Sequence, residues 1–331
     1  MRALVTGATG FVGPYLVEHL VGAGDDVVGV DLPLDVTDAE AMHRILLEAK
    51  PEVVYHLAAL SHVGESWNAP SEVFRVNTMG TLNVLLAARS SGVDRVLVVG
   101  SAEQYGRVEP GDMPIDEDQP LRPITPYGAS KAAAEMAASH AHLGRGLPVL
   151  CARAFNHIGP GQSPGLVVSA IAQQVAVNER TGADVVLAGD LTPTRDFTDV
   201  RDVVRAYRLL VERGQPGEIY NVCSGRAVAI REVAEKLLAL ADRPMRIETD
   251  PARLRPVEVP AHWGDNTKLR STTGWLPTIP LERSMADVLA WWRTRTEPAA
   301  ADTDPAASAS AAAAAADLDP AAAVEIPRAG S

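Results

Sequence analysis

Tyr127 and Lys131 stand four residues apart in the segment Tyr-Gly-Ala-Ser-Lys, a spacing that puts two side chains on one face of a helix. An ammonium group beside a phenol favours the phenolate, so we expect Tyr127 to exchange a proton near neutral pH. Ser101 offers a hydroxyl that can hold a carbonyl oxygen. With a dinucleotide to carry hydride, these residue types predict an enzyme that interconverts a carbonyl and an alcohol.

A glycine-rich turn near the N-terminus is suited to such a dinucleotide. Gly7, Gly10 and Gly13 have the spacing GxxGxxG, after an apolar run and at the start of a helical pattern. Glycines let the backbone approach a pyrophosphate, and the helix start presents unpaired N–H groups to it. A tight turn without a ligand is the alternative, which the strand–turn–helix context disfavours. The predicted cofactor contacts here are Gly7, Thr9, Gly10, Phe11, Val12 and Gly13.

Asp31 ends the next predicted strand, where a carboxylate accepts hydrogen bonds from the adenosine ribose. A carboxylate there repels a 2′-phosphate, so Asp31 favours NADH over NADPH as the form of NAD(P)H used. The loop after Asp31 is short and leads at once to Asp35 and Val36, which are two further predicted cofactor contacts. Such a loop leaves the adenosine end open, which suits a cofactor that is exchanged at each turnover.

The elements that position these residues alternate between strand and helix patterns. Strands are predicted at 3–5, 26–30, 53–57, 95–99 and 148–152, and helices at 11–21, 37–49, 71–90 and around Tyr127 and Lys131. Thr37 with Glu40 matches a capping box at the start of the second helix. Repeated units of this kind predict an α/β fold, a Rossmann-type doubly wound parallel sheet.

The rest of the chain divides into a lobe and a tail. Residues 1–154 are the predicted Rossmann domain, to which some later segments return, and 155–296 form a smaller α/β C-terminal lobe with helices at 200–212 and 230–241. Residues 297–331 are rich in Ala and Pro and have few large apolar side chains. Such a composition cannot repay the entropy of ordering, so a disordered tail is predicted.

Composition narrows the partners of this 331-residue chain. A formal net charge of -12 without a basic cluster argues against nucleic acid. The chain shows no leader and no apolar run of membrane-spanning length, so we expect no membrane partner and a cytoplasmic location. Cys151 and Cys223 lie in apolar runs and are expected to be buried, reduced thiols. The scattered histidines predict no metal site.

Taken together, these motifs resemble the extended short-chain dehydrogenase/reductase (NAD-dependent epimerase/dehydratase) family from residue 1 to about residue 293. Ser101-x-Glu103, Leu57-Ala58-Ala59 and Asn77 are part of the resemblance. It implies that Leu57, Ala58, Ala59, Asn77, Tyr127 and Lys131 contact the cofactor. It also implies a homodimer that forms through the helices at 71–90 and 127–142.

The second half is similar to the branch of that family that acts on GDP-mannose and its derivatives. The similar stretches are 155–162, 195–200, 220–225 and 255–260. The resemblance implies that NAD(P)H reduces the 4-keto group of GDP-4-dehydro-6-deoxy-D-mannose to give GDP-D-rhamnose. Tyr127 would then protonate the oxygen at C4, Ser101 would hold it, and Lys131 would lower the tyrosine pKa. The implied substrate contacts are Ser61, His62, Ser101, Glu103, Asn156, Val167, Arg195, Arg255 and Glu258.

Other functions stay open at this point. Glu103 stands where the dehydratases of the family keep a base, which allows a GDP-mannose 4,6-dehydratase. A nucleotide-sugar 4-epimerase is a third reading, and a silent dinucleotide sensor or scaffold is a fourth. A reductase consumes its cofactor whereas a dehydratase does not, so cofactor consumption separates the first two.

Overall fold

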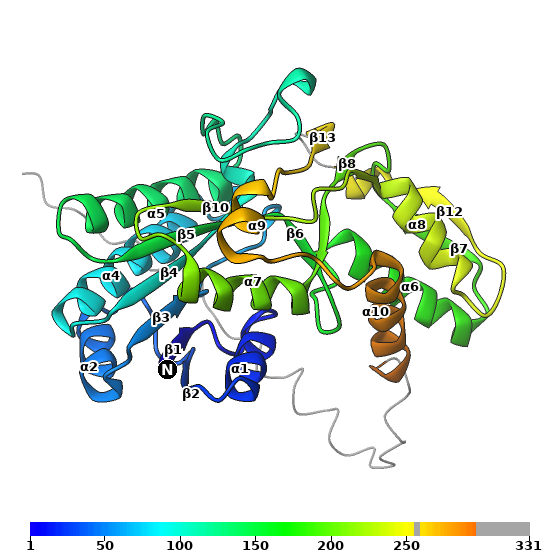
Figure 1. Ribbon diagram of the computed structural model, residues 1–331. Coiled ribbons are helices and arrows are strands. Elements are labelled where there is room, and N and C mark those ends of the chain that lie inside the picture. The colour runs from blue at the N-terminus through cyan, green and yellow to red at the C-terminus, as the bar shows by residue number, and fades with distance from the viewer. Residues whose placement is uncertain (255–258, 296–331) are drawn as a thin grey trace, which may run out of the picture. The chain divides into compact units, whose positions relative to one another are not determined.

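The computed structural model describes residues 1–254 and 259–295, and in that part of the chain six parallel strands form the largest sheet (Figure 1). The strands are β1 (Arg2–Thr6), β2 (Asp26–Val30), β3 (Val53–His56), β4 (Arg95–Ser101), β5 (Val149–Ala154) and β10 (Ile219–Val222). Their order across the sheet is β2-β1-β3-β4-β5-β10. The predicted doubly wound parallel sheet is therefore confirmed. The predictions for the tail from 297, and for Arg255 and Glu258, lie outside the described residues.

Helices cover both faces of this sheet. On one face α1 (Gly13–Gly22) and α7 (Val200–Arg213) pack through apolar residues such as Leu16 and Tyr207. On the other face lie α2 (Ala39–Ala49), α4 (Thr81–Ser90) and α5 (Pro126–Leu143). Since both faces are covered, the inner strands β3 and β5 are buried throughout, and β3 has the apolar-rich sequence Val-Val-Tyr-His.

The strand order creates a crevice at one point of the sheet edge. The chain passes from β1 through α1 to β2, and it then returns to the other side of β1 to form β3. Connections therefore leave β1 and β3 in opposite directions, which opens a crevice beyond the carboxyl ends of these strands. The glycine turn after β1 and the segment after β3 lie at this switch point.

His56, the last residue of β3, is buried beneath this switch point and links the elements around it by hydrogen bonds. The Thr81 hydroxyl donates to the Asn77 carbonyl, so its oxygen accepts from Nε2–H of His56 at 2.9 Å. Nδ1 of His56 then accepts from the Thr6 hydroxyl at 2.8 Å. Burial, with the nearby Lys131 charge, lowers the pKa of His56 to about 3, so the ring is neutral and links β1, β3 and α4.

Two helix boundaries differ from the sequence-based expectation. Asp38, not Thr37, caps α2, because the Thr37 backbone N–H donates to the Asp35 carboxylate and the helix begins at Ala39. The helix expected at 71–90 consists of α3 (Pro70–Phe74), a π-helical segment (Arg75–Gly80) and α4. The wider turn carries Asn77, whose side chain bonds to the backbone of Leu60. Such π turns are common near functional sites.

A second group of elements forms the lobe beyond the carboxyl ends of the sheet (Figure 1). Its helices α6 (Val167–Thr181), α8 (Ile230–Ala239) and α10 (Leu281–Arg295) share one apolar core. Its short strands are β6 (Asn156–Ile158), β7 (Val185–Ala188), β8 (Thr194–Arg195), β9 (Phe197–Asp199), β11 (Val228–Ala229), β12 (Arg246–Thr249) and β13 (Ala261–His262). The chain returns to the sheet in α7 and β10, with α9 (Thr267–Thr273) beside them.

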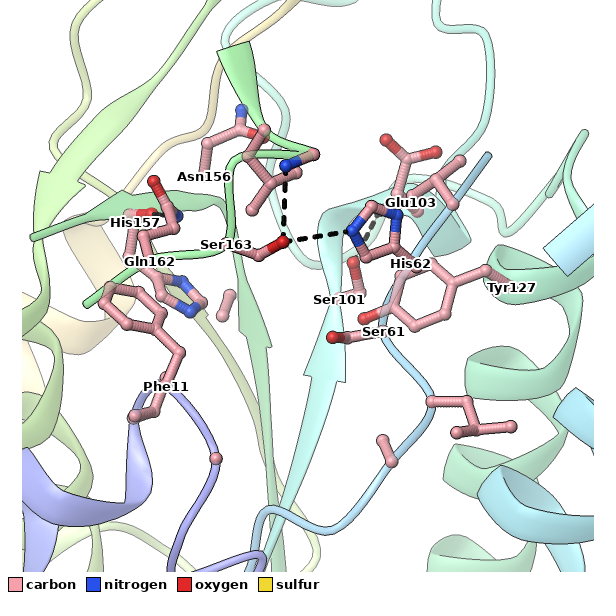
Figure 2. A pocket seen from close by; sticks show the side chains of 18 of the residues that line it. Phe11, Ser61, His62, Ser101, Glu103, Tyr127, Asn156, His157, Gln162 and Ser163 are labelled. Atoms are coloured by element: carbon pink, nitrogen blue, oxygen red, sulfur yellow. Dashed lines mark hydrogen bonds between the residues drawn. The ribbon is translucent and has the colours of Figure 1, made fainter. Parts of the chain in front are cut away.

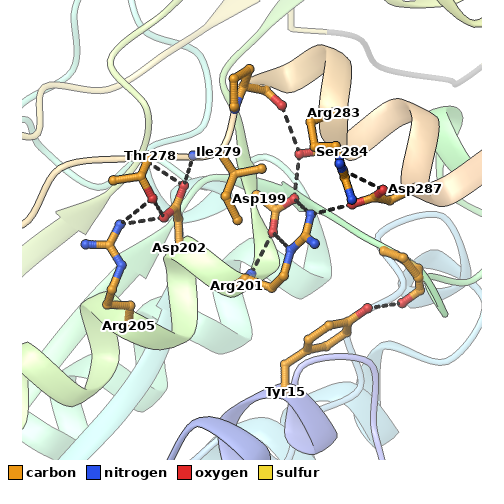
Figure 3. Close-up of polar contacts among 12 residues, drawn as sticks. Tyr15, Asp199, Arg201, Asp202, Arg205, Thr278, Ile279, Arg283, Ser284 and Asp287 are labelled. Atoms are coloured by element: carbon orange, nitrogen blue, oxygen red, sulfur yellow. Dashed lines mark hydrogen bonds and ion pairs between the residues drawn. The ribbon is translucent and has the colours of Figure 1, made fainter.

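Carboxylates at the start of α7 join the sheet side to the lobe (Figure 3). Asp199 caps α7 by accepting from the Arg201 backbone N–H, and it also accepts from the Ser284 hydroxyl on α10. The Arg201 guanidinium donates both to Asp199 and to Asp287 on α10. These buried and half-buried bonds fix α10 against the start of α7. None of the helices in the described residues is long and apolar enough to cross a membrane.

Candidate active site

A cavity of about 840 Å³ lies beyond the carboxyl ends of the central strands. One wall comes from the glycine turn and the ends of β2 to β5, and the other comes from the lobe (Figure 2). The sequence-predicted residues that line it are Gly7, Gly10, Phe11, Val12, Gly13, Asp31, Asp35, Val36, Leu57, Ala58, Ala59, Ser61, His62, Ser101, Glu103, Tyr127, Lys131, Asn156, Val167 and Arg195. The fold thus brings together residues that are up to 188 positions apart, Gly7 and Arg195.

In the glycine turn, Gly7 and Gly13 are closely surrounded by backbone atoms, whereas Gly10 has space around its Cα. Gly7 has φ +72°, and a Cβ there would lie 2.8 Å from the Ala58 nitrogen. A Cβ on Gly13 would lie 2.4 Å from two carbonyl oxygens. A Cβ on Gly10 would meet only the Gly7 oxygen, at 3.4 Å. Among the described residues no side chain caps α1, so its first N–H groups suit a diphosphate, and the site fits a dinucleotide.

Asp31 is held in place by the turn itself. One carboxylate oxygen accepts from the Thr9 backbone N–H at 2.9 Å and from the Thr9 hydroxyl at 2.7 Å. The other oxygen accepts from the Leu32 backbone N–H at 2.9 Å. Partial burial works against ionisation, but these hydrogen bonds outweigh it and lower the pKa of Asp31. An oriented, ionised carboxylate therefore lines the cavity at the end of β2.

Thr9 and Asn77 lie behind the cavity wall rather than in it. Thr9 orients Asp31, as its two hydrogen bonds show. Asn77 accepts from the Leu60 N–H at 2.7 Å and donates to the Leu60 carbonyl at 3.0 Å and to the Ser130 hydroxyl at 2.9 Å. Asn77 thus ties the segment after β3 to α5, the helix that carries Tyr127.

Ser101, Tyr127 and Lys131 all line the cavity. Ser101 ends β4, and the other two lie one turn apart on the inner face of α5. Figure 2 shows the Ser101, Tyr127 and Ser61 hydroxyls near one another. Of the four predicted catalytic side chains, those of Ser101, Tyr127 and Lys131 are buried and that of Glu103 is half-buried, and all four line the cavity. A substrate oxygen placed there would meet two hydroxyls at once.

The electrostatics of this group differ from the expectation. Burial raises the pKa of Tyr127 to about 12, with Ser101 opposing the rise through a hydrogen bond and the Glu103 charge adding to it. Burial lowers the pKa of Lys131 to about 8. The Lys131 ammonium donates to the Val99 carbonyl at 2.7 Å and does not lower the tyrosine pKa as we expected. Tyr127 is therefore a neutral phenol, the form that a general acid requires.

The lobe supplies the other predicted substrate contacts. Asn156 donates to the Asp196 carbonyl at 3.3 Å, and Arg195 donates to the Val259 carbonyl at 2.8 Å. Across the cavity, Nε2 of His62 and the Ser163 hydroxyl lie 3.5 Å apart (Figure 2). Arg255 and Glu258 are outside the described residues, so their predicted roles stay predictions. For the described residues, no cluster of three or more His, Cys, Asp or Glu side chains could hold a metal ion.

Several cavity residues were not singled out from the sequence. The His157 ring stacks on Phe11 with centroids 5.9 Å apart and planes inclined by 5°. His262 lies beside Arg195 in the parallel pairing of β13 with β8, and burial, with the Arg195 charge, lowers its pKa to about 4. His157 stands inside a stretch with a family resemblance, which was a usable signal. His262 had none, because it reaches the cavity through the pairing of two distant segments.

Comparison with known proteins agrees with this geometry. Residues 3–223 match the NAD dependent epimerase/dehydratase family. The chain is 37% identical over 298 residues to GDP-6-deoxy-D-mannose reductase of Pseudomonas aeruginosa, covering 89% of this chain and 98% of the reductase. It is 33% identical over 329 residues to UDP-glucose 4-epimerase of Mycolicibacterium smegmatis, covering 90% and 100%.

A solved structure resembles the whole described arrangement. The structure of RMD from Pseudomonas aeruginosa complexed with NADPH has a TM-score of 0.83 and 34% sequence identity to this chain. The match covers 89% of this chain and 100% of that one. The similarity thus extends over both the sheet and the lobe, the two parts that enclose the cavity.

Proposed function

This chain belongs to the NAD dependent epimerase/dehydratase family, and on that basis we propose that it uses NAD(P)H to reduce the 4-keto group of GDP-4-dehydro-6-deoxy-D-mannose, giving GDP-D-rhamnose. The observation that carries the proposal is the placement of Ser101, Tyr127 and Lys131 beside the glycine turn in one cavity. The 37% identity to a GDP-6-deoxy-D-mannose reductase supports the choice of sugar.

Tyr127, Ser101 and Lys131 have different roles in this reduction. When bound, NAD(P)H supplies the hydride that adds to C4 of the sugar. The neutral Tyr127 phenol donates its proton to the C4 oxygen, and the Ser101 hydroxyl donates a hydrogen bond to the charge that grows there. The Lys131 ammonium, held by the Val99 carbonyl, is placed to bind the ribose on the nicotinamide side.

The diphosphate and the cofactor ribose have their own candidate groups. Arg195, and Arg255 beyond the described residues, would clamp the GDP diphosphate, since guanidinium groups bind phosphate oxygens with paired hydrogen bonds. The ionised Asp31 would accept from the adenosine ribose hydroxyls and disfavour a 2′-phosphate. We therefore infer a preference for NADH, although the solved relative holds NADPH.

A direct assay tests the function. Purified protein is incubated with GDP-4-dehydro-6-deoxy-D-mannose, and oxidation of NADH and of NADPH is followed in separate reactions. We expect oxidation with GDP-D-rhamnose as the product, faster with NADH, and a Tyr127→Phe variant that binds cofactor normally but loses turnover by about 1,000-fold or more. Near-normal turnover of that variant would contradict the mechanism.

The opposite result leads to a dehydratase. If neither coenzyme is oxidised, the reductase proposal is wrong. Glu103 lines the same cavity and would then be the candidate base for a GDP-mannose 4,6-dehydratase, whose product forms without net cofactor consumption. A UDP-sugar that is epimerised instead would favour a 4-epimerase, as the similarity to a UDP-glucose 4-epimerase allows.

The assembly and location are also proposals. Met79 and Leu86 are seven residues apart, as are Met136 and Leu143, and all four side chains are exposed on adjoining helical segments. Exposed apolar stripes of this kind mark interaction surfaces, so a second copy of this chain is their proposed partner. The free thiols of Cys151 and Cys223 accord with a reducing compartment, which supports the cytoplasm.

A further inference from the structure

Gln104 lies directly behind Ser101, and its side-chain amide is bonded at both ends. It is fully buried in the short helical turn that follows β4. Its Oε1 accepts from the Ser101 backbone N–H at 2.8 Å. Its Nε2 donates to an oxygen of Glu135 on α5 at 2.8 Å. A single side chain thus connects the strand that ends in Ser101 to the helix that carries Tyr127.

The orientation of this amide is determined by its neighbours. Glu135 also receives two hydrogen bonds from Arg153, at 2.9 and 2.7 Å, and an ionised carboxylate can only accept. The NH₂ end of Gln104 must therefore face Glu135, and this leaves its oxygen for the Ser101 N–H. Reversing the amide would break both bonds.

The pair beyond Gln104 is firmly anchored. The Arg153–Glu135 ion pair has only 4% and 2% of its side chains exposed. Arg153, on β5, also donates to the Tyr105 hydroxyl at 2.9 Å, and that hydroxyl donates to Asn221 on β10 at 2.7 Å. Because Glu135, Arg153 and Tyr105 are each hydrogen-bonded to the next member of this network, they give Gln104 a rigid support.

The backbone next to Ser101 is shaped around Gln104. A Cβ on Gly100 would lie 2.5 Å from the Gln104 oxygen, so a side chain at position 100 would displace the amide. On the other side, the Ser101 hydroxyl accepts from the Glu103 N–H at 3.2 Å. The turn from Ser101 to Gln104 is thus closed by two reciprocal bonds, one of which comes from the Gln104 side chain.

We propose that Gln104 is a positioning residue that holds Ser101 at the distance from Tyr127 that carbonyl reduction requires. This inference rests on the proposed function. Tyr127, Lys131 and Glu135 follow one another at four-residue spacing on one face of α5, so the bond to Glu135 fixes Ser101 relative to the same helix face. Without it the Ser101 N–H would be unpaired and the hydroxyl free to shift, and a shift of about 1 Å can cost about 100-fold in rate.

Kinetics of a Gln104→Met variant test the proposal, with Gln215→Met, on an exposed loop, as the matched control. We expect kcat of Gln104→Met to fall about 10- to 100-fold while KM and the cofactor dissociation constant change less than about twofold. In a Ser101→Ala background the same substitution should have almost no further effect, because the two residues act as one unit. An equal loss of kcat in both backgrounds, or no loss in either, would overturn the proposal.

A conservative variant provides a second readout that a structural role would not change. Gln104→Glu keeps the acceptor for Ser101 but places a second carboxylate against Glu135. Two ionised carboxylates in contact repel each other, and a proton shared between them restores the missing hydrogen bond. The ratio of variant to wild-type kcat should therefore rise as the pH is lowered from about 8 to about 6. A ratio that does not change with pH would count against the proposal.

Hydrogen exchange separates this proposal from the function that it assumes. In the full-length protein, the Ser101 amide should exchange faster in Gln104→Met than in wild type, while the Leu97 amide in the same strand stays protected. If wild type does not oxidise NAD(P)H, the proposed function fails, and the exchange of Ser101 still decides whether Gln104 holds it. Unchanged protection at Ser101 would refute the positioning role under either result.

Discussion

Lys131 is the residue whose charge most directly links this site to pH. Its ammonium is buried, bonded to the Val99 carbonyl, and has a pKa of about 8. The charged form is the one that can bind ribose hydroxyls and hold the cofactor near Tyr127. We therefore expect kcat/KM, measured from about pH 6.5 to about pH 10, to fall as the pH rises through about 8.

A variant and a stability measurement identify the source of this decline. Lys131→Arg keeps its charge at high pH, so its residual activity should lose the alkaline limb. The folded pKa of Lys131 lies below the value of 10.5 for an exposed lysine, so the unfolded chain binds more protons between these values. Stability should thus rise, not fall, between about pH 8 and about pH 10. The same limb in Lys131→Arg would contradict the assignment.

Residue types were easier to predict than their electrostatic states. Ser101, Tyr127 and Lys131 were found because their spacing carries chemical meaning along the chain. The pKa values could not be predicted in this way, because the burial of a side chain depends on segments that are distant in the sequence. For Tyr127, burial raises the pKa instead of lowering it. Gln104 was missed for the same reason, since its partner Glu135 is 31 residues away.

At the level of elements, the turn between β1 and α1 contains one glycine that the fold requires and another that only a bound diphosphate would require. A Cβ on Gly13 would overlap two backbone oxygens at 2.4 Å, so Gly13→Ala should lose about 1–3 kcal/mol of unfolding free energy. A Cβ on Gly10 meets nothing nearer than 3.4 Å, so Gly10→Ala should keep its stability within about 0.5 kcal/mol. Only a bound diphosphate would be hindered by it.

Cofactor titration and thermal unfolding of the two variants check this difference. Gly10→Ala should weaken NAD(P)H binding by at least about tenfold at an unchanged melting temperature, since the glycine leaves room for the pyrophosphate. Gly22→Ala, at the end of the same helix and with no described atom within 4 Å of its Cβ, is the control that should bind normally. Wild-type affinity in Gly10→Ala would mean that the diphosphate does not lie on this turn.

The alternation of strands and helices could be predicted because it depends on local apolar periodicity. The start of α2 and the π-helical segment could not. The start of α2 follows a local contact of the Asp35 carboxylate with the Thr37 N–H, which the capping-box pattern did not indicate, and the π-helical segment carries Asn77, whose partner Leu60 is 17 residues away. In each case a side chain that supports the cavity takes precedence over the regular helical pattern.

On the scale of the whole molecule, buried polar contacts such as that of Asp199 with Ser284 help to join the sheet side to the lobe. The described part of the second half both builds the lobe and returns to the sheet, in α7 and β10. No local sequence pattern shows whether a helix packs against the sheet or in the lobe, because an apolar helix face has the same pattern in both places. The joining residues, such as Asp199 with Ser284, likewise lie 85 positions apart.

The outer face of α4 and α5 leads to a prediction about assembly. Met136 is 55% exposed and Leu143 is 82% exposed on α5, beside Leu86 on α4, so each copy offers a stripe that a two-fold axis would pair with itself.

Met136→Glu would bury a charge in that pairing. We expect wild type to sediment as a dimer at micromolar concentration and Met136→Glu as a monomer, whereas Val21→Glu, an equally exposed position on α1, should stay dimeric. A monomeric wild type, or dimers in both variants, would show that this face is not the interface. Because Tyr127 and Lys131 lie on the inner face of the same helix, we also expect the monomer to lose part of its activity through a less rigid α5.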